Sequence, residues 1–571
     1  MSGLGFTHWG ALVAIAVGVS FCPIDYASAQ ITPDGTLLNN SSVTREGDTF
    51  NITGGTQAGS NLFHSFGEFS VPTGSIADFN NALDIQNIIT RVTGGSVSNI
   101  DIDGLIRTLG TANLFLTNPN GIVFGGNASL NVGGSFVATS ANALQFGNRG
   151  FFSATDQNIP SPLLTVNPSA LLFNQINQNG GIQNNSVAPA GTDPAGFDAF
   201  GLRVPDGKSL LLVGGNVSMD GGRLNAYGGR AELGGLAQAG TLALAVDGDN
   251  VSLIFPENVA RTSVSLTNQA GVIVTGAGGG NIAVNARNLE ILGGSLITAG
   301  VGKGLGTPET VAGDITLNAT ESIKVAGTGS NVRNLVGLGS LGNGGNITID
   351  SGSLSLQNGA ELIASTSGLG NAGNVNVNVT DAVDIAGRNS GILSSVSTGT
   401  VGNGGNISID SGSFSLRDRA ELSASTSGLG NAGTIKVNTA QVNISGSNSN
   451  INSDFLVNSQ STTGTAGDII LTSPRITLDN TGTLNAQSAS GNGGNIFLQT
   501  DLLLLRRGAQ IPTTAVTALT GGNGGNISIN TSGILIAVKP VPEPTLPFSV
   551  FAITAFYAAW RLKRKHKQIT F

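Results

Sequence analysis

A glycine-rich turn, followed in most copies by Asn or Asp and then by alternating apolar residues, recurs through the C-terminal half of the chain. The residue after the last glycine of each copy stands at 281, 314, 346, 374, 406, 434, 468, 495 and 526, so the copies lie 27 to 34 residues apart. A period of about 30 residues is typical of solenoids and propellers, in which each unit buries its apolar face against its neighbours. We therefore expect a stack of units.

The pattern inside one unit is that of short strands. Apolar and polar residues alternate at 347–349, 354–356 and 362–364, and a period of two is typical of β-strands. Three strands per unit, separated by Gly and Asn turns, predict a parallel β-helix in which equivalent turns form side-chain ladders. A propeller blade would need about 40–50 residues and a signature of its own. We therefore expect an all-β solenoid.

Composition excludes other repetitive folds. Gly contributes 85 of the 571 residues, but it shows no three-residue period and Pro is scarce, which excludes collagen. Charged residues make up only 11% of the chain, which excludes a coiled coil. A mean hydropathy of +0.17, with apolar residues spread evenly, argues against charge-driven disorder.

The acidic residues of the repeats bear on catalysis. A β-helix can carry a polysaccharide lyase or glycosidase, which needs paired carboxylates or a carboxylate–calcium site. Here Asp350 recurs as Asp410, and Glu361 recurs as Glu421. Copied residues are typical of solvated positions on a stack, so we expect no enzyme, no catalytic residue and no cofactor. A β-helical lyase or glycosidase remains the alternative. Asn526 stands where a calcium-binding nonapeptide has Asp, so we also expect no metal site.

The N-terminal segment has the pattern of an export signal. Residues 4–21 are nearly free of charge and apolar at their centre, and Ala27 and Ala29 form an A-x-A-like cleavage site. A transmembrane anchor is the alternative, although the apolar run is short for one. Cleavage after Ala29 would remove Cys22, the one cysteine, and would leave no disulfide or cysteine chemistry.

The C-terminal segment has the order of a sorting tail. Pro542, Glu543 and Pro544 precede an apolar run at 546–560 and a basic cluster at 561–567. The apolar run predicts a short membrane helix, and the basic cluster would hold its end at the cytoplasmic face. This order resembles the PEP-CTERM signal of exported bacterial proteins, and the resemblance implies cutting near Pro542–Pro544 by an exosortase-like enzyme. A plain tail anchor is the alternative.

Charge argues against nucleic acid as a partner. Five of the 26 Lys and Arg residues lie in the basic tail, so the remainder carries 21 basic against 34 acidic residues. Nucleic-acid phosphates need basic patches, which an acidic chain does not supply. His64 is the one histidine outside the terminal segments, which argues against a histidine-rich metal site.

The N-terminal region resembles a known secretion domain. The strand-like runs at 61–70, 88–96 and 112–125 are similar to the secretion domain of the filamentous haemagglutinin family, the large partner in two-partner secretion. Its NPNGI motif matches Asn118, Pro119, Asn120, Gly121 and Ile122. The match spans residues 30–175. The family's second motif, NPNL, is missing, and Phe79-Asn80-Asn81 lies in roughly its place.

The resemblance implies a right-handed β-helix and transfer across the outer membrane through a TpsB-like barrel that recognises residues 30–175. It also implies that residues 118–122 are a secretion determinant. The residue types alone indicate only a tight turn, because Pro119 fixes φ and its neighbours favour turns. On this basis we expect changes at Asn118 and Asn120 to leave the fold intact and to block surface exposure.

These observations predict five segments and one function. The segments are a signal peptide at 1–29, the secretion domain at 30–175, a Gln-, Asn-, Gly- and Pro-rich loop or linker at 176–200, β-helix repeats at 201–540, and the sorting tail at 541–571. A long, repetitive and mostly uncharged face suits weak multivalent contact. We therefore expect an exported cell-surface or secreted protein, adhesin-like or structural, whose targets include polysaccharide or other cells.

Overall fold

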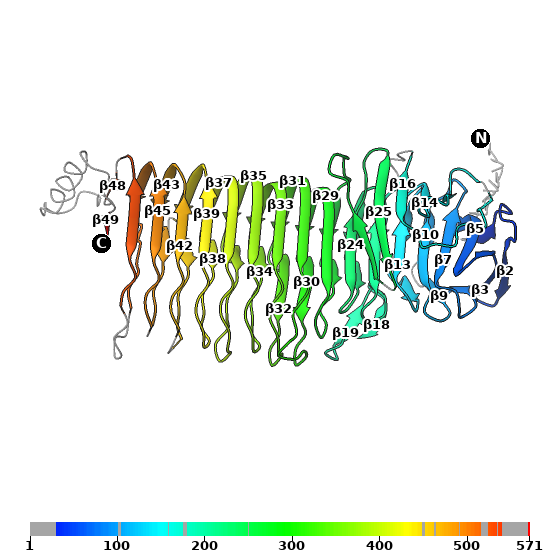
Figure 1. Cartoon of the computed structure of the whole chain (residues 1–571), viewed down its shortest axis with the longest axis horizontal. Helices are drawn as coiled ribbons and strands as arrows, with labels where there is room; N and C mark the ends of the chain where they lie inside the picture. The colour runs from blue at the N-terminus through cyan, green and yellow to red at the C-terminus, as the bar shows by residue number, and fades with distance from the viewer. Residues whose placement is uncertain are drawn as a thin grey trace, which may run out of the picture.

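Every regular element that the structure describes is a β-strand. The computed structural model describes residues 30–538, apart from 101–103, 158, 175–179, 249, 448–451, 462–463, 490, 516–522 and 534, together with residues 569–570. The strands stack side by side along a rod, with the first strands at one end and the last strands at the other (Figure 1). In the described residues, no helix has the length and apolarity that a membrane span requires.

Successive units of the repeat pair with one another in parallel. Ile347 lies opposite Val375 in the next unit, and Leu354 lies opposite Val383. The chain thus advances one coil per repeat, and the all-β fold with long parallel sheets fits a parallel β-helix. The long strands of these units are β29 (Asn281–Leu292), β31 (Ile315–Ala326), β33 (Ile347–Gln357), β35 (Val375–Ala386) and β37 (Ile407–Arg417). A short strand on another side of the coil completes most units, namely β34 (Glu361–Ile363), β36 (Gly391–Leu393), β38 (Glu421–Ser423) and β41 (Asp454–Leu456).

In the units from β29 to β37, two of the three expected strands are joined, whereas later units keep them as separate strands. The expected strands at 347–349 and 354–356 form one continuous element, β33, and the third corresponds to β34. The register with β31 shifts between Ser351 and Ser353, so the strand bends where a turn was expected. A Cβ atom on Gly352 would lie 2.3 Å from the carbonyl oxygen of Glu321, so only glycine allows the two coils to approach at this bend.

The inward residues form one apolar core along the rod. Ile347, Ile349, Leu354, Leu356 and Leu362 are each at most 1% exposed. Their neighbours in the sequence point outward, as the period of two requires. Because each inward position stacks on the same position of the next coil, small and branched apolar side chains fill a narrow interior.

The Asn and Asp residues that mark the repeat form a hydrogen-bonded ladder. The backbone N–H of Asn346 donates to Asp314 Oδ1 at 2.7 Å, and that of Asn374 donates to Asn346 Oδ1 at 3.0 Å. A second column behaves in the same way, since the N–H of Asn403 donates to Asn371 Oδ1 at 2.9 Å. The side-chain ladders predicted from the sequence are therefore confirmed.

The repeated aspartates occupy a column in which acceptors alternate with donors. Asn378 Nδ2 donates to Asp350 Oδ1 at 3.2 Å, and Asn438 Nδ2 donates to Asp410 Oδ1 at 3.0 Å. Placing Asn between the two Asp residues avoids contact between like charges on neighbouring strands. These carboxylates therefore hold adjacent coils together.

Antiparallel strands cover the N-terminal end of the rod. There the first strand pairs antiparallel with β5, and β2 and β3 form a hairpin beside it. The regular parallel pairing starts where β5 meets β7. An antiparallel cover protects the first coil from edge-to-edge association. The strands are β1 (Ile31–Pro33), β2 (Ser41–Glu46), β3 (Thr49–Gly54), β5 (Asn61–Phe69) and β7 (Asn87–Val92).

A five-stranded antiparallel sheet lies outside the coil and buries a second apolar core. Phe63, Phe115 and Leu211 point away from the coil's interior, yet each is fully buried beneath this sheet. The repeat pattern did not predict it, because its strands do not repeat and one of its pairings, Ala170 with Ala243, joins residues far apart in the sequence. They are β14 (Ala143–Gln145), β15 (Phe151–Ser153), β16 (Ala170–Phe173), β25 (Gly240–Asp247) and β26 (Asn250–Ile254).

The described part of the segment expected to be a loop or linker, residues 180–200, begins with a strand of the coil. Its strand β17 (Ile182–Asn184) pairs in parallel with β11 (Ile122–Phe124) on one side and β22 (Val217–Asp220) on the other. Strands β18 (Pro189–Thr192) and β19 (Asp198–Phe200) then form a hairpin that projects from the rod (Figure 1). The expectation of a loop was wrong for residues 182–184, because Ile182 is buried in the core of the coil although no alternation of apolar and polar residues marks the strand.

Candidate functional site

The residues predicted as a secretion motif form a corner between two strands. Asn118 follows β10 (Asn113–Thr117), and Ile122 begins β11. The N–H of Gly121 donates to the carbonyl oxygen of Asn118 at 3.0 Å, which closes a tight turn. Gly121 has a φ of 109°, a backbone conformation that other residues rarely adopt. The turn predicted from Asn, Pro and Gly is therefore confirmed.

Asn118 joins this corner to the preceding coil. Its side chain is fully buried, and Nδ2 donates to Ser96 O at 3.0 Å and to Ser98 Oγ at 2.9 Å. Its Oδ1 accepts the backbone N–H of Asn120 at 3.0 Å. A buried amide with these bonds stabilises the fold, since its loss leaves buried partners without hydrogen bonds. The expectation that Asn118 can change without effect on the fold is therefore corrected.

Only Pro119 and Asn120 of the five motif residues are partly exposed. Asn120 Nδ2 also donates to the carbonyl oxygen of Gly94 at 2.7 Å, so this side chain is held against the same preceding coil. The corner presents a small, rigid and uncharged surface. Such a surface suits recognition by shape and hydrogen bonding, and it carries no acid or base.

Asn81 occupies the place where the second family motif is missing. Its Nδ2 donates to the carbonyl oxygen of Leu109 at 3.1 Å, and its Oδ1 accepts the N–H of Leu109 at 2.9 Å. This pair of bonds ties one coil to the next, as a backbone rung would. Asn81 is buried, so its role in the structure is to stabilise this edge.

His64 lies inside the N-terminal cap as a neutral side chain. It is 1% exposed and stacks on the ring of Phe66, with 6.0 Å between the ring centroids. Nδ1 lies 3.0 Å from Ser41 Oγ. Burial lowers the pKa of His64 to about 3, because the charged form loses its hydration. His64 therefore has a packing role in the cap.

A buried arginine connects the cap to the outer sheet. Arg91 lies in β7, and its Nε donates to Ser65 Oγ at 2.8 Å. Nη1 donates to Ser153 O in β15 at 2.7 Å, and Nη2 donates to Thr36 Oγ1 at 2.8 Å. The guanidinium also lies over the ring of Phe152, 4.3 Å from its centroid. Burial lowers the pKa of Arg91 to about 10. This value is still well above neutral pH, so the side chain stays charged.

Asp34 supplies the opposite charge to Arg91 through shared hydroxyl groups. Its carboxylate accepts hydrogen bonds from Ser65 and Thr93 at 2.6 Å each and from Thr36 Oγ1 at 2.7 Å. Burial pushes the pKa of Asp34 upward, but these bonds together outweigh it and lower the pKa. The segment that follows β1 and residues of β5, β7 and β15 therefore share one polar network. Sequence reasoning missed it because its members are spread along the chain and carry no motif.

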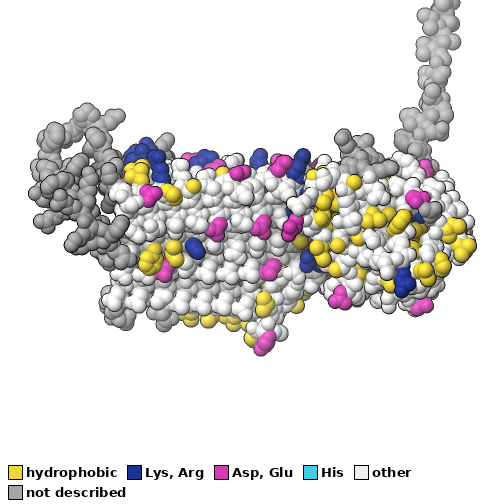
Figure 2. Space-filling view, turned by 45° about the horizontal axis from the view of Figure 1, so that its top comes forward, with side chains coloured by type: hydrophobic (Ala, Val, Ile, Leu, Met, Phe, Trp, Pro, Cys, Tyr) yellow, Lys and Arg dark blue, Asp and Glu magenta, His cyan; other side chains and the backbone are white. Residues whose placement is uncertain are grey.

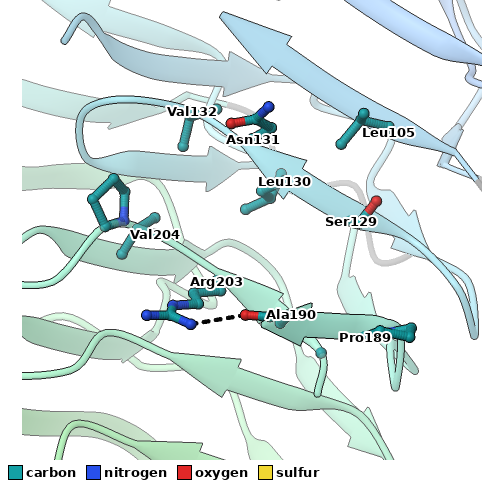
Figure 3. Close-up of a pocket in the computed structure, with 11 residues that line it drawn as sticks. Leu105, Ser129, Leu130, Asn131, Val132, Pro189, Ala190, Arg203 and Val204 are labelled. Carbon is teal, nitrogen blue, oxygen red and sulfur yellow. Dashed lines mark hydrogen bonds between the residues drawn. The ribbon is translucent and has the colours of Figure 1, made fainter. Parts of the chain in front are cut away.

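A pocket of about 400 Å³ opens where one face of the coil changes sheets (Figure 3). It lies between β12 (Ser129–Asn131) and β20 (Leu202–Arg203), which end their respective sheets and share no pairing in the described strands. Leu130 and Val204 line it, and Arg203 donates to Ala190 O at 2.8 Å beside it. Arg203 is the one charged side chain of the lining, so the pocket offers no acid–base pair.

The other predicted site residues lie outside the described residues. They are Ala27 and Ala29 of the cleavage site and Pro542, Glu543 and Pro544 of the sorting signal. Among the residues that the structure does describe, no group of three or more His, Cys, Asp or Glu side chains is arranged to hold a metal ion.

Comparisons with known proteins place the corner, the cap and the outer sheet in one domain. The family model described as TPS secretion domain matches residues 29–284. Among solved structures, the crystal structure of the HMW1 secretion domain from Haemophilus influenzae is similar, with 16% sequence identity and a TM-score of 0.46. That alignment covers 84% of this chain and 97% of the other. No curated protein gives a significant match.

The family match extends past the boundary expected at residue 175 and ends within β29. It includes residues 118–122, His64, Arg91 and all five strands of the outer sheet. The N-terminal part of this chain, residues 29–284, is therefore a TPS secretion domain.

Proposed function

We propose that this chain is the exported member of a two-partner secretion pair and that it acts outside the cell as a non-enzymatic, adhesin-like or structural rod. The observation that carries the proposal is the TPS secretion domain at residues 29–284. A TPS domain implies an outer-membrane transporter of the TpsB type as its partner. The protein then crosses the outer membrane and reaches the cell surface or the medium.

The surface of the TPS domain supports recognition by such a partner. Most of the large hydrophobic side chains exposed in the described residues belong to it, and Figure 2 shows hydrophobic side chains gathered towards that end of the rod. Leu38 and Leu83 are 78% and 77% exposed. Exposed apolar patches on a soluble domain are typical of interaction sites. Further examples are Phe151, Ile159, Leu163 and Phe197.

The remaining coils support a role in display. Their outward side chains are mostly uncharged, and the same columns of residues recur on neighbouring coils. A rigid rod with repeated surface groups suits many weak contacts made together. We propose that the coil is right-handed, because parallel strands joined by crossovers nearly always connect in that sense.

The two terminal segments complete the proposal. Ala27 and Ala29 would be the site at which an export signal is removed. Pro542, Glu543 and Pro544 would direct sorting by an exosortase-like enzyme. The support for both roles is the order of residue types in the sequence.

Surface exposure that depends on the transporter tests the proposed function. The full chain is produced in a Gram-negative host with and without its TpsB-type transporter, and intact cells are treated with protease. We expect degradation at the surface only when the transporter is present. Equal exposure without it would contradict the proposal. Removing residues 541–571 in the same host tests the tail, because loss of sorting should release the protein to the medium or the periplasm.

A further inference from the structure

One outward column is aliphatic on three of four successive coils and carries a short serine on the coil between them. Ile363, Leu393, Ser423 and Leu456 lie opposite one another on successive parallel strands, β34, β36, β38 and β41. The other three positions carry aliphatic side chains that cover the backbone. Ser423 is short, so the surface is hollowed at this point.

The hollow has a volume of about 220 Å³ and a lining of hydroxyl, amide and aliphatic groups. Small-molecule pockets usually measure about 300–1,000 Å³, so this hollow can hold only a small group, and it holds that group weakly. No charged side chain belongs to the lining. The residues that contribute most to its chemistry are Ser395, Ser423, Ser425, Leu456, Asn458 and Gln460.

Hydrogen bonds hold the polar groups of the lining in place. Ser423 Oγ lies 3.2 Å from Ser425 Oγ, and Ser425 Oγ accepts the N–H of Asn458 at 3.1 Å. Ser395 Oγ lies 3.4 Å from Ser423 Oγ. Each hydroxyl group can donate one hydrogen bond and accept two, so these groups keep capacity for a ligand. The hollow is thus a fixed cluster of hydroxyl groups beside two amide side chains.

The surroundings select against an anionic ligand. Glu361, Glu421 and Asp454 stand in the neighbouring column of the same face. Glu421 forms a side-chain hydrogen bond with Ser423, so one carboxylate directly adjoins the hollow. A sulfated or carboxylated ligand would meet this negative charge. A neutral ligand rich in hydroxyl groups would instead find acceptors in the carboxylate and in the Ser, Asn and Gln side chains.

We propose that the hollow at Ser423 binds one ring of a neutral polysaccharide. Leu456 provides an apolar wall for the C–H face of the ring, and the hydroxyl and amide groups bond its hydroxyls. The proposal rests on the proposed function, since it names the chemical class that the displayed rod contacts. Binding at one hollow is weak, and many rods on one surface would give it strength through multivalency.

The chain contains its own control for this site. Residues 361–367 read Glu-Leu-Ile-Ala-Ser-Thr-Ser, and residues 421–427 read Glu-Leu-Ser-Ala-Ser-Thr-Ser. The two coils differ in this stretch only at Ile363 and Ser423. Ser423→Ile therefore gives the second coil the sequence of the first, which the fold already accommodates. Ile363→Ser makes the reciprocal change and opens a second hollow.

Affinity electrophoresis of the purified full chain tests the proposal. Native gels contain dextran, hydroxyethyl cellulose or heparin, and retardation is measured against polymer concentration. We expect retardation by at least one neutral polymer and none by heparin. Ser423→Ile should weaken it at least about threefold, and Ile363→Ser should strengthen it. Circular dichroism melting curves confirm that both variants fold.

Three results would overturn the proposal. They are no retardation by either neutral polymer, equal retardation of Ser423→Ile and the parent chain, and stronger retardation by heparin. Purified protein binds without a transporter, so each result leaves the proposed export route untouched. Conversely, the chain could reach the cell surface without the transporter and still bind a neutral polymer. That result would contradict the proposed export route and leave the binding proposal standing.

Discussion

The side-chain oxygen Oδ1 of Asn374 lies 2.9 Å from the backbone nitrogen of Asn406, one coil further along the rod. Asn374 also donates through Nδ2 to Asn346 Oδ1 at 3.0 Å, in the coil before it. One side chain therefore connects three consecutive coils. The hydrogen bonds of this column run along the axis of the rod, beside the backbone pairing of the sheets.

Asn374→Ala should destabilise the repeats, because it removes both bonds at once. Asn406 is exposed and water can replace its lost partner, so we expect a loss of about 0.5–1.5 kcal/mol in the free energy of unfolding. The midpoint of urea unfolding measures it. Asn374→Asp is the matched control, because Asp loses only the donation to Asn346 and keeps the acceptor for Asn406, as Asp does at positions 314 and 468. A control as unstable as the alanine variant would argue against the ladder as the cause.

Thr434 interrupts the same column, and Thr434→Asn should repair it. The N–H of Thr434 donates to Asn406 Oδ1 at 2.8 Å, but its own side chain has no amide oxygen for the next coil, which begins at Asp468. Asn at this position would offer that acceptor, as Asn374 does to Asn406. We expect a gain of about 0.5–1 kcal/mol, read as a higher urea midpoint. An unchanged or lower midpoint would show that the column gains nothing from continuity.

Sequence reasoning predicted the local features of the repeats and missed the long-range ones. The repeat between units predicts the ladder at 346 and 374. The pattern within one unit predicts the alternation at 347–349. The outer sheet could not be predicted in this way, because β16 pairs with β25 some 70 residues away and neither strand repeats. Arg91 also gave no signal, since its partners come from three separate segments. The motif at 118–122 was identified as a turn, but its burial depends on neighbouring coils.

His64 should make the N-terminal cap sensitive to acid. Its pKa is about 3 in the folded chain and about 6.5 when unfolded, so the unfolded state binds the proton more tightly. The stability is complete above pH 6.5 and is lost as the pH falls below that value. Between pH 7 and pH 5 we expect a loss of about 2 kcal/mol for the cap. His64→Gln should flatten this dependence in urea unfolding, and an equal slope in both proteins would contradict the assignment.

Glu421 should make the repeats more stable as the pH falls, which is the opposite of the effect of His64 on the cap. Burial raises its pKa, and the nearby charges of Asp454 and Glu361 raise it further, while the bond with Ser423 opposes them. The folded state therefore binds this proton more tightly than the unfolded state does, and stability increases as the pH falls through the raised pKa. Glu421→Gln should raise the melting temperature at pH 7 and have little effect near pH 4. A variant less stable than the parent at pH 7 would refute this.

Asn118→Ala and Asn120→Ala should separate folding from export in the TPS domain. Asn118 is buried and bonded to Ser98, so its loss should cost about 1–3 kcal/mol and reduce export through the fold. Asn120 is partly exposed, so its loss should cost less and still block export if the corner is recognised. Asn225→Ala is the matched control, a buried amide of the same domain that bonds Phe200 O at 2.7 Å.

Protease treatment of intact cells measures export, and urea unfolding of the purified chains measures stability. We expect Asn118→Ala to resemble the Asn225 control in stability, with export reduced at least as much. Asn120→Ala should be exported less than Asn225→Ala, although Asn120→Ala is the more stable of the two proteins. Normal surface exposure of Asn120→Ala would mean that residues 118–122 act only as a corner of the coil. In that case the exposed apolar residues of the TPS domain, beginning with Leu38 and Leu83, become the surface to test.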